Sequence, residues 1–483
     1  MNRQMVLAVT GRVVFMIGLL MLLPIAVALY YHEGTDTLAP LTKAMAITLA
    51  CGGLCAFRTP KNRTIYVREA IAITGLGWIL TVLFGALPFI FSDAIPSFID
   101  AIFESASGFT TTGSSILTDV EALPKSLQFW RSFSHFIGGM GVLVFAIALI
   151  PGGSNSTSIH IMKTEMPGPT FEKVMSRVRE VARVFYLLYA TLTVVMIVVL
   201  IIAGMTPFDA MIHAFGTAGT GGFSNYNDSV AAFHSVPIEI ILSVGMLIFG
   251  VNFNIYFFAL RGRPSIFFKS EELHWYLGIV ILAILGLVGS TLPLYGDDLF
   301  TCAKDALFSV ATIITTTGFG TVDFTQWPLF SQLILLLLMF IGGCAGSTAG
   351  GLKISRMVCL IKLIFKKFQK AINPKRVTVV MYERKSLNER VQNDISLYFL
   401  LYVFTFIVLV FLISLENLDF TTTFSSVAAT FNNIGPGLGG VGPKCNFAEF
   451  SDFSKGVFSF AMIAGRLEIL PLILLFAPST WRA

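Results

Sequence analysis

Charged residues are scarce in this chain of 483 residues, of which they make up 13%. Soluble domains carry about 25%. Hydrophobic residues make up 55%, so the composition excludes an ordinary soluble domain and favours a chain embedded in a membrane. The net charge of +5 does not indicate nucleic-acid binding, because membrane proteins concentrate Lys and Arg in their cytoplasmic loops. We expect no nucleic-acid partner.

Cysteine and histidine are also rare, with six residues of each. The cysteines show no spacing typical of a disulfide framework or a zinc site, and the histidines show no ligand spacing. A catalytic pair at membrane depth, such as His with carboxylates, is not evident in the sequence. We therefore expect no enzyme, no covalent cofactor and no transition-metal site.

Long apolar runs, in contrast, are abundant. A bilayer-spanning helix needs about 20 apolar residues, and ten segments meet or approach this length: 6–30, 42–57, 69–92, 129–150, 183–204, 237–260, 274–294, 329–352, 395–415 and 455–477. The first is longer than the apolar region of a typical signal peptide and lacks a clear cleavage site. The sequence therefore predicts an all-α polytopic membrane protein with about ten transmembrane helices.

Four shorter apolar segments, 98–110, 207–219, 301–314 and 420–431, each run into a turn rich in Thr, Gly or Asn. Segments of this length are too short to cross a bilayer. Non-helical backbone at membrane depth is tolerated where it lines a cavity or is buried in protein. We therefore predict four helix–re-entrant loop–helix repeats around a pseudo-fourfold pore, preceded by two extra N-terminal helices.

The turns have the chemistry of an ion filter. Rings of backbone carbonyls can replace the hydration shell of a cation, glycine permits close approach of backbones, and a short helix aims its negative end at the ion. Ordinary turns that cap interfacial helices are the alternative, but they would require the same coincidence four times. The predicted cation-binding residues are Thr111, Thr112, Gly113, Thr220, Gly221, Gly222, Thr316, Thr317, Gly318, Asn433, Ile434 and Gly435.

The chain resembles the Trk/Ktr/HKT superfamily of potassium transporters over essentially its whole length. The runs that carry the resemblance are 107–113 (SGFTTTG), 221–224 (GGFS), 341–353 (IGGCAGSTAGGLK), 432–439 (NNIGPGLG), 465–468 (GRLE) and 165–169 (EMPGP). The resemblance implies one filter lined by the four turn glycines, a homodimer, and a cytosolic ring of nucleotide-binding regulatory subunits of the TrkA kind. Because the four turns differ from one another, we expect preference for potassium, acceptance of rubidium and partial admission of sodium.

A glycine-rich segment below the turns is a second candidate site. Its predicted gate residues are Gly342, Gly343, Gly346, Ser347, Thr348, Gly350 and Gly351. Close helix packing through small residues is one interpretation; the resemblance implies a flexible gate loop instead. Arg466 completes the predicted gate, since a charge in a membrane span is usually functional or paired. The resemblance implies that Arg466 faces the pore as a barrier to cations. The alternatives are a structural pair with Glu468 and a helix end near the membrane interface, to which the side chain extends.

The basic residues predict the orientation. They gather in the loops 58–68, 163–179, 261–269 and 353–390, which the positive-inside rule places in the cytoplasm together with both termini. The last loop is a candidate docking surface for the regulator. The nine acidic residues predicted for the outer connections are Glu33, Asp36, Asp93, Asp119, Glu121, Asp228, Asp297, Asp298 and Asp323. They would give a mildly acidic vestibule, unless the outer loops merely lack Lys and Arg.

The predicted units are an N-terminal extension (1–67) and four pore repeats (68–182, 183–272, 273–394 and 395–483). The function expected is potassium uptake across the bacterial inner membrane through a channel-like pore. The alternative is a potassium–proton symporter that works by alternating access. Parallel repeats and the absence of an evident acidic relay in the spans argue against that alternative.

Overall fold

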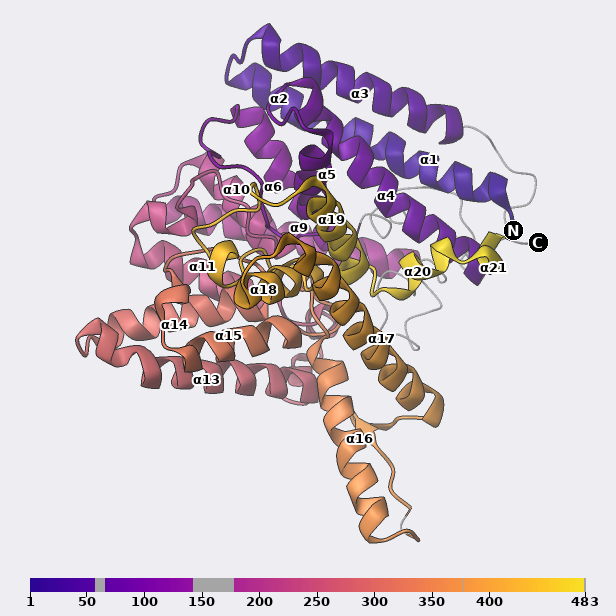
Figure 1. The fold of residues 1–483 in the computed structure, drawn as a ribbon, viewed down its shortest axis with the longest axis vertical. Helices are drawn as coiled ribbons and strands as arrows, with labels where there is room; N and C mark the ends of the chain where they lie inside the picture. Colours follow the sequence, from indigo (N-terminus) through magenta and orange to yellow (C-terminus); the bar gives the residue numbers. More distant parts are fainter. Residues whose placement is uncertain (57–65, 142–177, 376, 482–483) are drawn as a thin grey trace.

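The computed structural model of the chain describes residues 1–56, 66–141, 178–375 and 377–481. This part is mostly helical, and its one sheet is a short antiparallel hairpin of β1 (Met381–Tyr382) and β2 (Lys385–Ser386). The helices surround a central region where several short elements and turns meet (Figure 1). The predicted all-α class is confirmed.

Six helical stretches in the described ranges are long and apolar enough to cross a membrane. They are Arg3–Tyr30 (α1, Arg3–Leu20, and α2, Leu22–Tyr30), Thr35–Ala56 (α3), Val67–Phe91 (α4), Ala182–Ile202 (in α9, Val178–Ile202), Glu271–Tyr295 (with α13, Glu271–Thr291) and Glu389–Glu416 (with α17, Glu389–Ile413). Large apolar side chains on them face outward, for example Leu282 at 71% and Phe411 at 72% exposure, as expected of a surface that contacts lipid.

Several predicted spans differ from the observed helices. The predicted span 237–260 is two helices, α11 (Val236–Phe249) and α12 (Phe253–Leu260), bent by 85°; counting the pair gives seven candidate spans. The predicted span 455–477 is divided into α19 (Asp452–Arg466) and α20 (Leu470–Phe476), and α21 (Pro478–Trp481) follows. The predicted span 129–150 lies partly outside the described residues, so the count of ten stays a prediction.

The four short apolar segments form helices at the predicted places: α5 (Phe98–Phe109), α10 (Pro207–Gly219), α14 (Leu299–Ile314) and α18 (Phe420–Phe431). Each follows one of the long helices α4, α9, α13 and α17. Each is followed by a helix of 13 to 15 residues, α6 (Lys125–Gly139), α11, α15 (Leu329–Ile341) or α19. The same order of elements therefore occurs four times.

Side-chain caps fix where the short helices begin. Ser97, Thr206 and Asp419 each accept a hydrogen bond from the backbone N–H three residues later, at 3.3, 3.2 and 2.9 Å, which satisfies a free donor of the first turn. Asp298 caps α14 in the same way at 3.2 Å. It lies 20 residues before Gly318, whereas the other caps lie 16 residues before their glycines. The third short helix is thus one turn longer.

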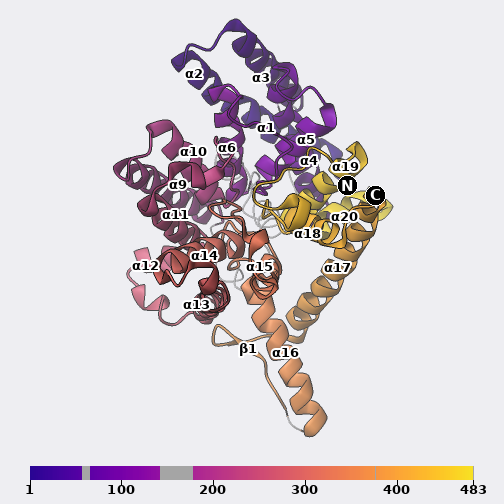
Figure 2. The ribbon, with the colours of Figure 1, turned by 60° about the vertical axis from the view of Figure 1, so that its left-hand side comes forward.

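The second helices pack around the short ones. α5 contacts α4, α6 and α19, and α18 contacts α17 and α19, so the first and last units share one large hydrophobic core. α1 packs against α3 and α4 at one end of the molecule, and α16 (Ile354–Ile372) protrudes with the start of α17 at the other (Figures 1 and 2). α1 begins close to where α21 ends (Figures 1 and 2).

Candidate functional site

The four predicted turns have the same backbone conformation. In each, the first predicted residue has a left-handed φ of 56–58°, and this residue is Thr111, Thr220, Thr316 or Asn433. The glycine two positions later also has positive φ, between 75° and 103°. The residue between them donates its N–H to a carbonyl five residues earlier, at 2.8–2.9 Å, which closes the short helix with the bond typical of a Schellman motif.

The structure brings the four turns together in a closed ring. A Cβ atom built on Gly113 would lie 2.0 Å from the carbonyl oxygen of Gly221, one on Gly222 2.1 Å from that of Thr317, one on Gly318 2.0 Å from that of Ile434, and one on Gly435 2.9 Å from that of Thr112. The contacts run from the first turn to the second, third and fourth, and back to the first. Only glycine fits such close approach of backbone to backbone.

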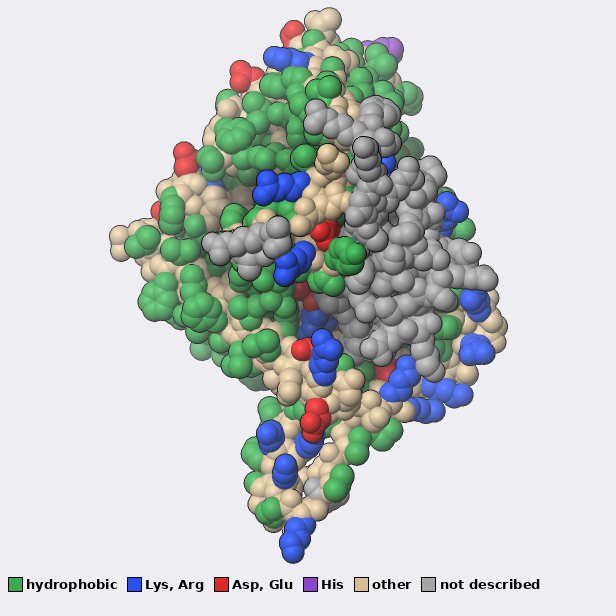
Figure 3. Space-filling model, turned by 90° about the vertical axis from the view of Figure 1, so that its right-hand side faces the viewer, with side chains coloured by type: hydrophobic (Ala, Val, Ile, Leu, Met, Phe, Trp, Pro, Cys, Tyr) green, Lys and Arg blue, Asp and Glu red, His purple; other side chains and the backbone are tan. Residues whose placement is uncertain are grey.

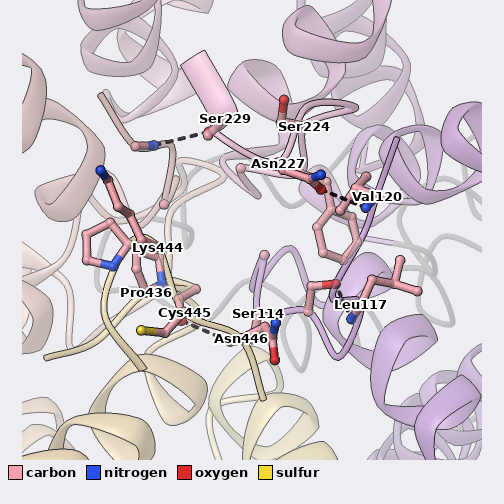
Figure 4. A pocket seen from close by; sticks show the side chains of 18 of the residues that line it. Ser114, Leu117, Val120, Ser224, Asn227, Ser229, Pro436, Lys444, Cys445 and Asn446 are labelled. Carbon is pink, nitrogen blue, oxygen red and sulfur yellow. Dashed lines mark hydrogen bonds between the residues drawn. The ribbon is translucent and has the colours of Figure 1, made fainter. Parts of the chain in front are cut away.

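Above the ring lies a cavity of about 250 Å³, and all four turn glycines line it. Its walls come from the segments that follow the turns, and Figure 4 shows side chains of these segments around the opening. Of the nine acidic residues predicted for the outer connections, only Asp228 lines this cavity, and it shares the wall with Lys444 and Arg131. The immediate surroundings of the ring are therefore not acidic, contrary to the expectation of an acidic vestibule.

His135 on α6 supports the second turn. Its Nδ1 lies 2.7 Å from the carbonyl oxygen of Gly108, and its Nε2 accepts the N–H of Phe223 at 3.2 Å. A Cβ on Gly221 would lie 2.4 Å from the imidazole ring. In the first and third turns the equivalent position is Thr112 or Thr317, whose hydroxyl bonds a neighbouring threonine at 2.8 Å. The imidazole thus replaces a threonine side chain behind the second turn.

A buried ion pair holds the segments after the first two turns. Nε of Arg131 donates to Glu104 at 2.7 Å, and the two side chains are 2% and 0% exposed. Glu104 also accepts from Ser115 and from the N–H of Ile116, while Arg131 donates to the carbonyl oxygen of Ser224 at 3.1 Å. A buried charge pair of this kind is stable only when hydrogen bonds satisfy its remaining atoms, and here both segments supply them.

Glu104, Arg131 and His135 are absent from the residues that the turn pattern singles out. The signal that could have found them is the presence of charged or titratable side chains in apolar segments, which are usually paired or functional. Glu104 and Arg131 are charged residues of this kind, and they are paired with each other. In the part of the chain that the structure describes, no three His, Cys, Asp or Glu side chains are placed to hold a metal ion.

The glycine-rich segment is not helical: α15 ends at Ile341 and α16 begins at Ile354. The interpretation of this segment as a helix that packs through small residues is therefore wrong. The N–H of Gly350 donates to the Thr316 hydroxyl at 2.7 Å, and a Cβ on Gly350 would lie 2.2 Å from the carbonyl oxygen of Asn432. The segment 342–351 thus lies directly against the third and fourth turns. We call this segment the loop.

The remaining predicted gate residues hold the loop in a folded shape. Gly342 and Gly346 have φ of 72° and 70°, and a Cβ on Gly343 would lie 2.6 Å from that of Ala349. The hydroxyl of Ser347 caps the carbonyl of Cys344 at 2.7 Å. The loop is thus a set of tight turns rather than an open strand.

Arg466, at the end of α19, also contacts the loop. It donates to the carbonyl oxygens of Thr348, Gly138 and Gly139, each at 2.6 Å. Glu468 pairs with Arg356 of α16. Arg466, Gly346, Ser347, Gly350 and Gly351 line a small cavity beneath the turns. The guanidinium thus lies in the cavity wall and connects the loop with the end of α6. The run 165–169 lies outside the described residues.

Comparisons with known proteins agree with this architecture. A family model described as "TrkH: Cation transport protein" matches residues 39–272 and 299–482. The chain is 36% identical to the Trk system potassium uptake protein TrkH of Salmonella typhimurium and 32% identical to TrkG of Escherichia coli K12, in both cases over the full length of both proteins.

The crystal structure of the potassium transporter TrkH from Vibrio parahaemolyticus superposes with a TM-score of 0.90 at 33% identity, and all of both chains is covered. Identity above 30% over the full length and a family model that matches most of the chain together show the family. The chain belongs to the TrkH family of cation transport proteins.

Proposed function

We propose that the chain takes up potassium across the bacterial inner membrane through a channel-like pore, and that the four turns are its selectivity filter. The observation that carries the proposal is the closed ring of turn glycines and carbonyl oxygens. Potassium is the ion because the relatives are named potassium uptake proteins. The carbonyl oxygens of Thr112, Gly221, Thr317 and Ile434 would replace part of its hydration shell.

The proposed pore is built by four repeats with the boundaries predicted above, after an N-terminal extension of two helices. Ten helices cross the membrane and both termini are cytoplasmic. Support comes from the fourfold order of long, short and second helices and from the six to seven candidate spans among the described residues. The cavity above the ring then faces outward, and the loop and Arg466 lie on the cytoplasmic side of the filter.

The loop and Arg466 form the proposed gate. The loop contacts two of the four turns, so its displacement would open the path beneath them. We further propose a homodimer and a TrkA-like cytosolic ring of nucleotide-binding subunits as regulator. The surface proposed for its docking is the protruding region of α16, where Lys and Arg side chains gather (Figure 3). They include Lys362, Lys366, Lys367 and Lys370.

Growth rescue tests this function. The chain is expressed in bacterial cells that lack their own potassium uptake systems, and growth is measured at low potassium. Uptake of rubidium and of sodium is measured in the same cells. We expect rescue, rubidium uptake close to that of potassium, and smaller sodium uptake. Failure to rescue by protein that is present in the membrane would overturn the proposal.

Potassium–proton symport by alternating access is a second candidate, because the bent pair α11–α12 and the divided α19–α20 are the broken helices common in carriers. The pairing of the buried Glu104 with Arg131 argues against a proton site there. Recordings in planar bilayers separate the two functions. Unitary current steps support the pore, whereas proton flux coupled to potassium without such steps supports the symporter.

A further inference from the structure

One buried carboxylate outside the ring holds the loop from the side of α13. Glu272 is the second residue of α13 and is 3% exposed. Its Oε1 accepts the backbone N–H of Ala345, inside the loop, at 2.7 Å. Its Oε2 accepts a hydrogen bond from the amide of Asn252 at 3.2 Å. Both oxygens of this buried carboxyl group thus have a hydrogen-bond partner, and one partner is the backbone of the loop.

The same part of the loop is hydrogen-bonded to residues 250 and 253, at the break between α11 and α12. The N–H of Cys344 donates to the carbonyl oxygen of Gly250 at 3.0 Å, and that of Phe253 donates to the carbonyl oxygen of Gly346 at 3.1 Å. Asn252 caps α12 through its side chain. Glu272 therefore connects two elements that meet at the loop: the break and the start of α13.

The start of α13 is in turn held by the cytoplasmic hairpin. Oε1 of Glu383, in the turn between β1 and β2, accepts from the hydroxyl of Ser270 at 2.8 Å and from the N–H of Glu272 at 3.0 Å. Tyr382 is 3% exposed and packs in the same hydrophobic cluster as Leu273. Figure 2 shows the hairpin strand β1 beside α16. A displacement of the hairpin would thus move the backbone that carries Glu272.

We propose that Glu272 is the positioning residue that holds the loop beneath the filter, and that the hairpin 381–386 acts on the loop through it. This rests on the proposed role of the loop as gate. Glu272 does not touch the ion path in this arrangement. It acts by fixing Ala345, and a regulator that moves the hairpin would release the loop by moving this anchor.

The test compares three variants in proteoliposomes without regulator, where potassium flux reports the basal open fraction. Glu272→Ala removes the anchor and should raise flux about tenfold, the factor that corresponds to about 1.4 kcal/mol, a typical net contribution of one hydrogen bond. Glu272→Gln keeps an acceptor for the Ala345 N–H and should raise it much less. Glu389→Gln alters an exposed carboxylate at the start of α17 and should leave basal flux as in the parent protein.

A second measurement follows the loop directly. Cys344 is 0% exposed, so in a background with the five other cysteines replaced its reaction rate with a maleimide reports the release of the loop. The rate should rise in Glu272→Ala about as much as flux does. This readout distinguishes a released loop from a protein that is merely unstable, because an unfolded fraction would be labelled without conducting.

Deletion of 344–349 separates failure of this inference from failure of the gate itself. If the deletion raises flux but Glu272→Ala leaves both flux and labelling unchanged, Glu272 is not the anchor and the gate stands. If the deletion does not raise flux in folded protein, the loop is not the gate. In the deletion background, Glu272→Ala should have no further effect, and an additional increase would contradict the proposed route.

Discussion

Nη1 of Arg466 donates a hydrogen bond of 2.6 Å to the carbonyl oxygen of Thr348, so the end of α19 is joined to the middle of the loop. A cationic side chain in this place acts in two ways. Its charge raises the energy of a cation in the cavity beneath the turns, and its hydrogen bonds hold the loop. Both effects predict that loss of the side chain speeds permeation.

The first prediction concerns that charge. Arg466→Ala should raise potassium flux by tenfold or more, since two like charges about 4 Å apart repel with about 4 kcal/mol near a protein surface and about 1.4 kcal/mol is a factor of ten. Arg466→Lys keeps the charge and should stay within a few-fold of the parent protein. Flux into proteoliposomes measures both variants. Equal flux of Arg466→Ala and the parent would contradict a barrier at this residue.

A second prediction concerns the ring. Gly318→Ser adds a Cβ where the carbonyl oxygen of Ile434 lies only 2.0 Å away, so the fourth turn must shift and its carbonyl must leave the ring. The ratio of rubidium to sodium uptake should fall several-fold. Gly320→Ser is the matched control, since its nearest atom would be at 3.7 Å. A ratio unchanged in Gly318→Ser would argue against the filter assignment.

A third prediction concerns the contact between loop and ring. Thr316→Ala removes the hydroxyl that accepts the N–H of Gly350 but leaves the backbone carbonyls in place. Basal flux should therefore rise, while the ratio of rubidium to sodium uptake changes little. Thr316→Ser keeps the hydroxyl and should resemble the parent. A change of ion preference without a change of flux would show that Thr316 serves the filter alone.

A fourth prediction concerns stability. Glu104→Ala leaves the buried guanidinium of Arg131 without its partner and should cost roughly 3–5 kcal/mol, seen as a lower thermal midpoint in detergent. Glu271→Ala breaks a pair whose side chains are 29% and 30% exposed and should cost less than about 1 kcal/mol. Similar midpoints for the two variants would mean that the buried pair does not hold the structure together.

The short helices could be predicted from the sequence because their signals are local. A capping side chain such as Thr206 or Asp419, a short apolar run and a Thr- or Gly-rich turn together define α10 and α18 to the residue. The closing of the turns into a ring was expected from the repetition, but the pairing of each glycine with one carbonyl depends on contacts between distant segments.

The helix breaks and the supporting residues were not predictable in this way. The segment 237–260 is mostly apolar, and at its break Gly250 and Phe253 make hydrogen bonds with the loop almost a hundred residues later. The structure shows that Asn252 caps α12 and bonds Glu272. A titratable residue in an apolar segment draws attention to His135, but its contact with Gly221 depends on the packing of distant segments.

The imidazole behind the second turn takes the place of the threonine side chain that lies behind the first and third turns. Because a single chain supplies all four turns, a substitution changes one turn and leaves the other three unchanged. In a channel of four identical subunits the same substitution is made four times. In the proposed filter, a single substitution is therefore expected to change ion preference less than in such a channel, and His135 lies behind one of the four turns.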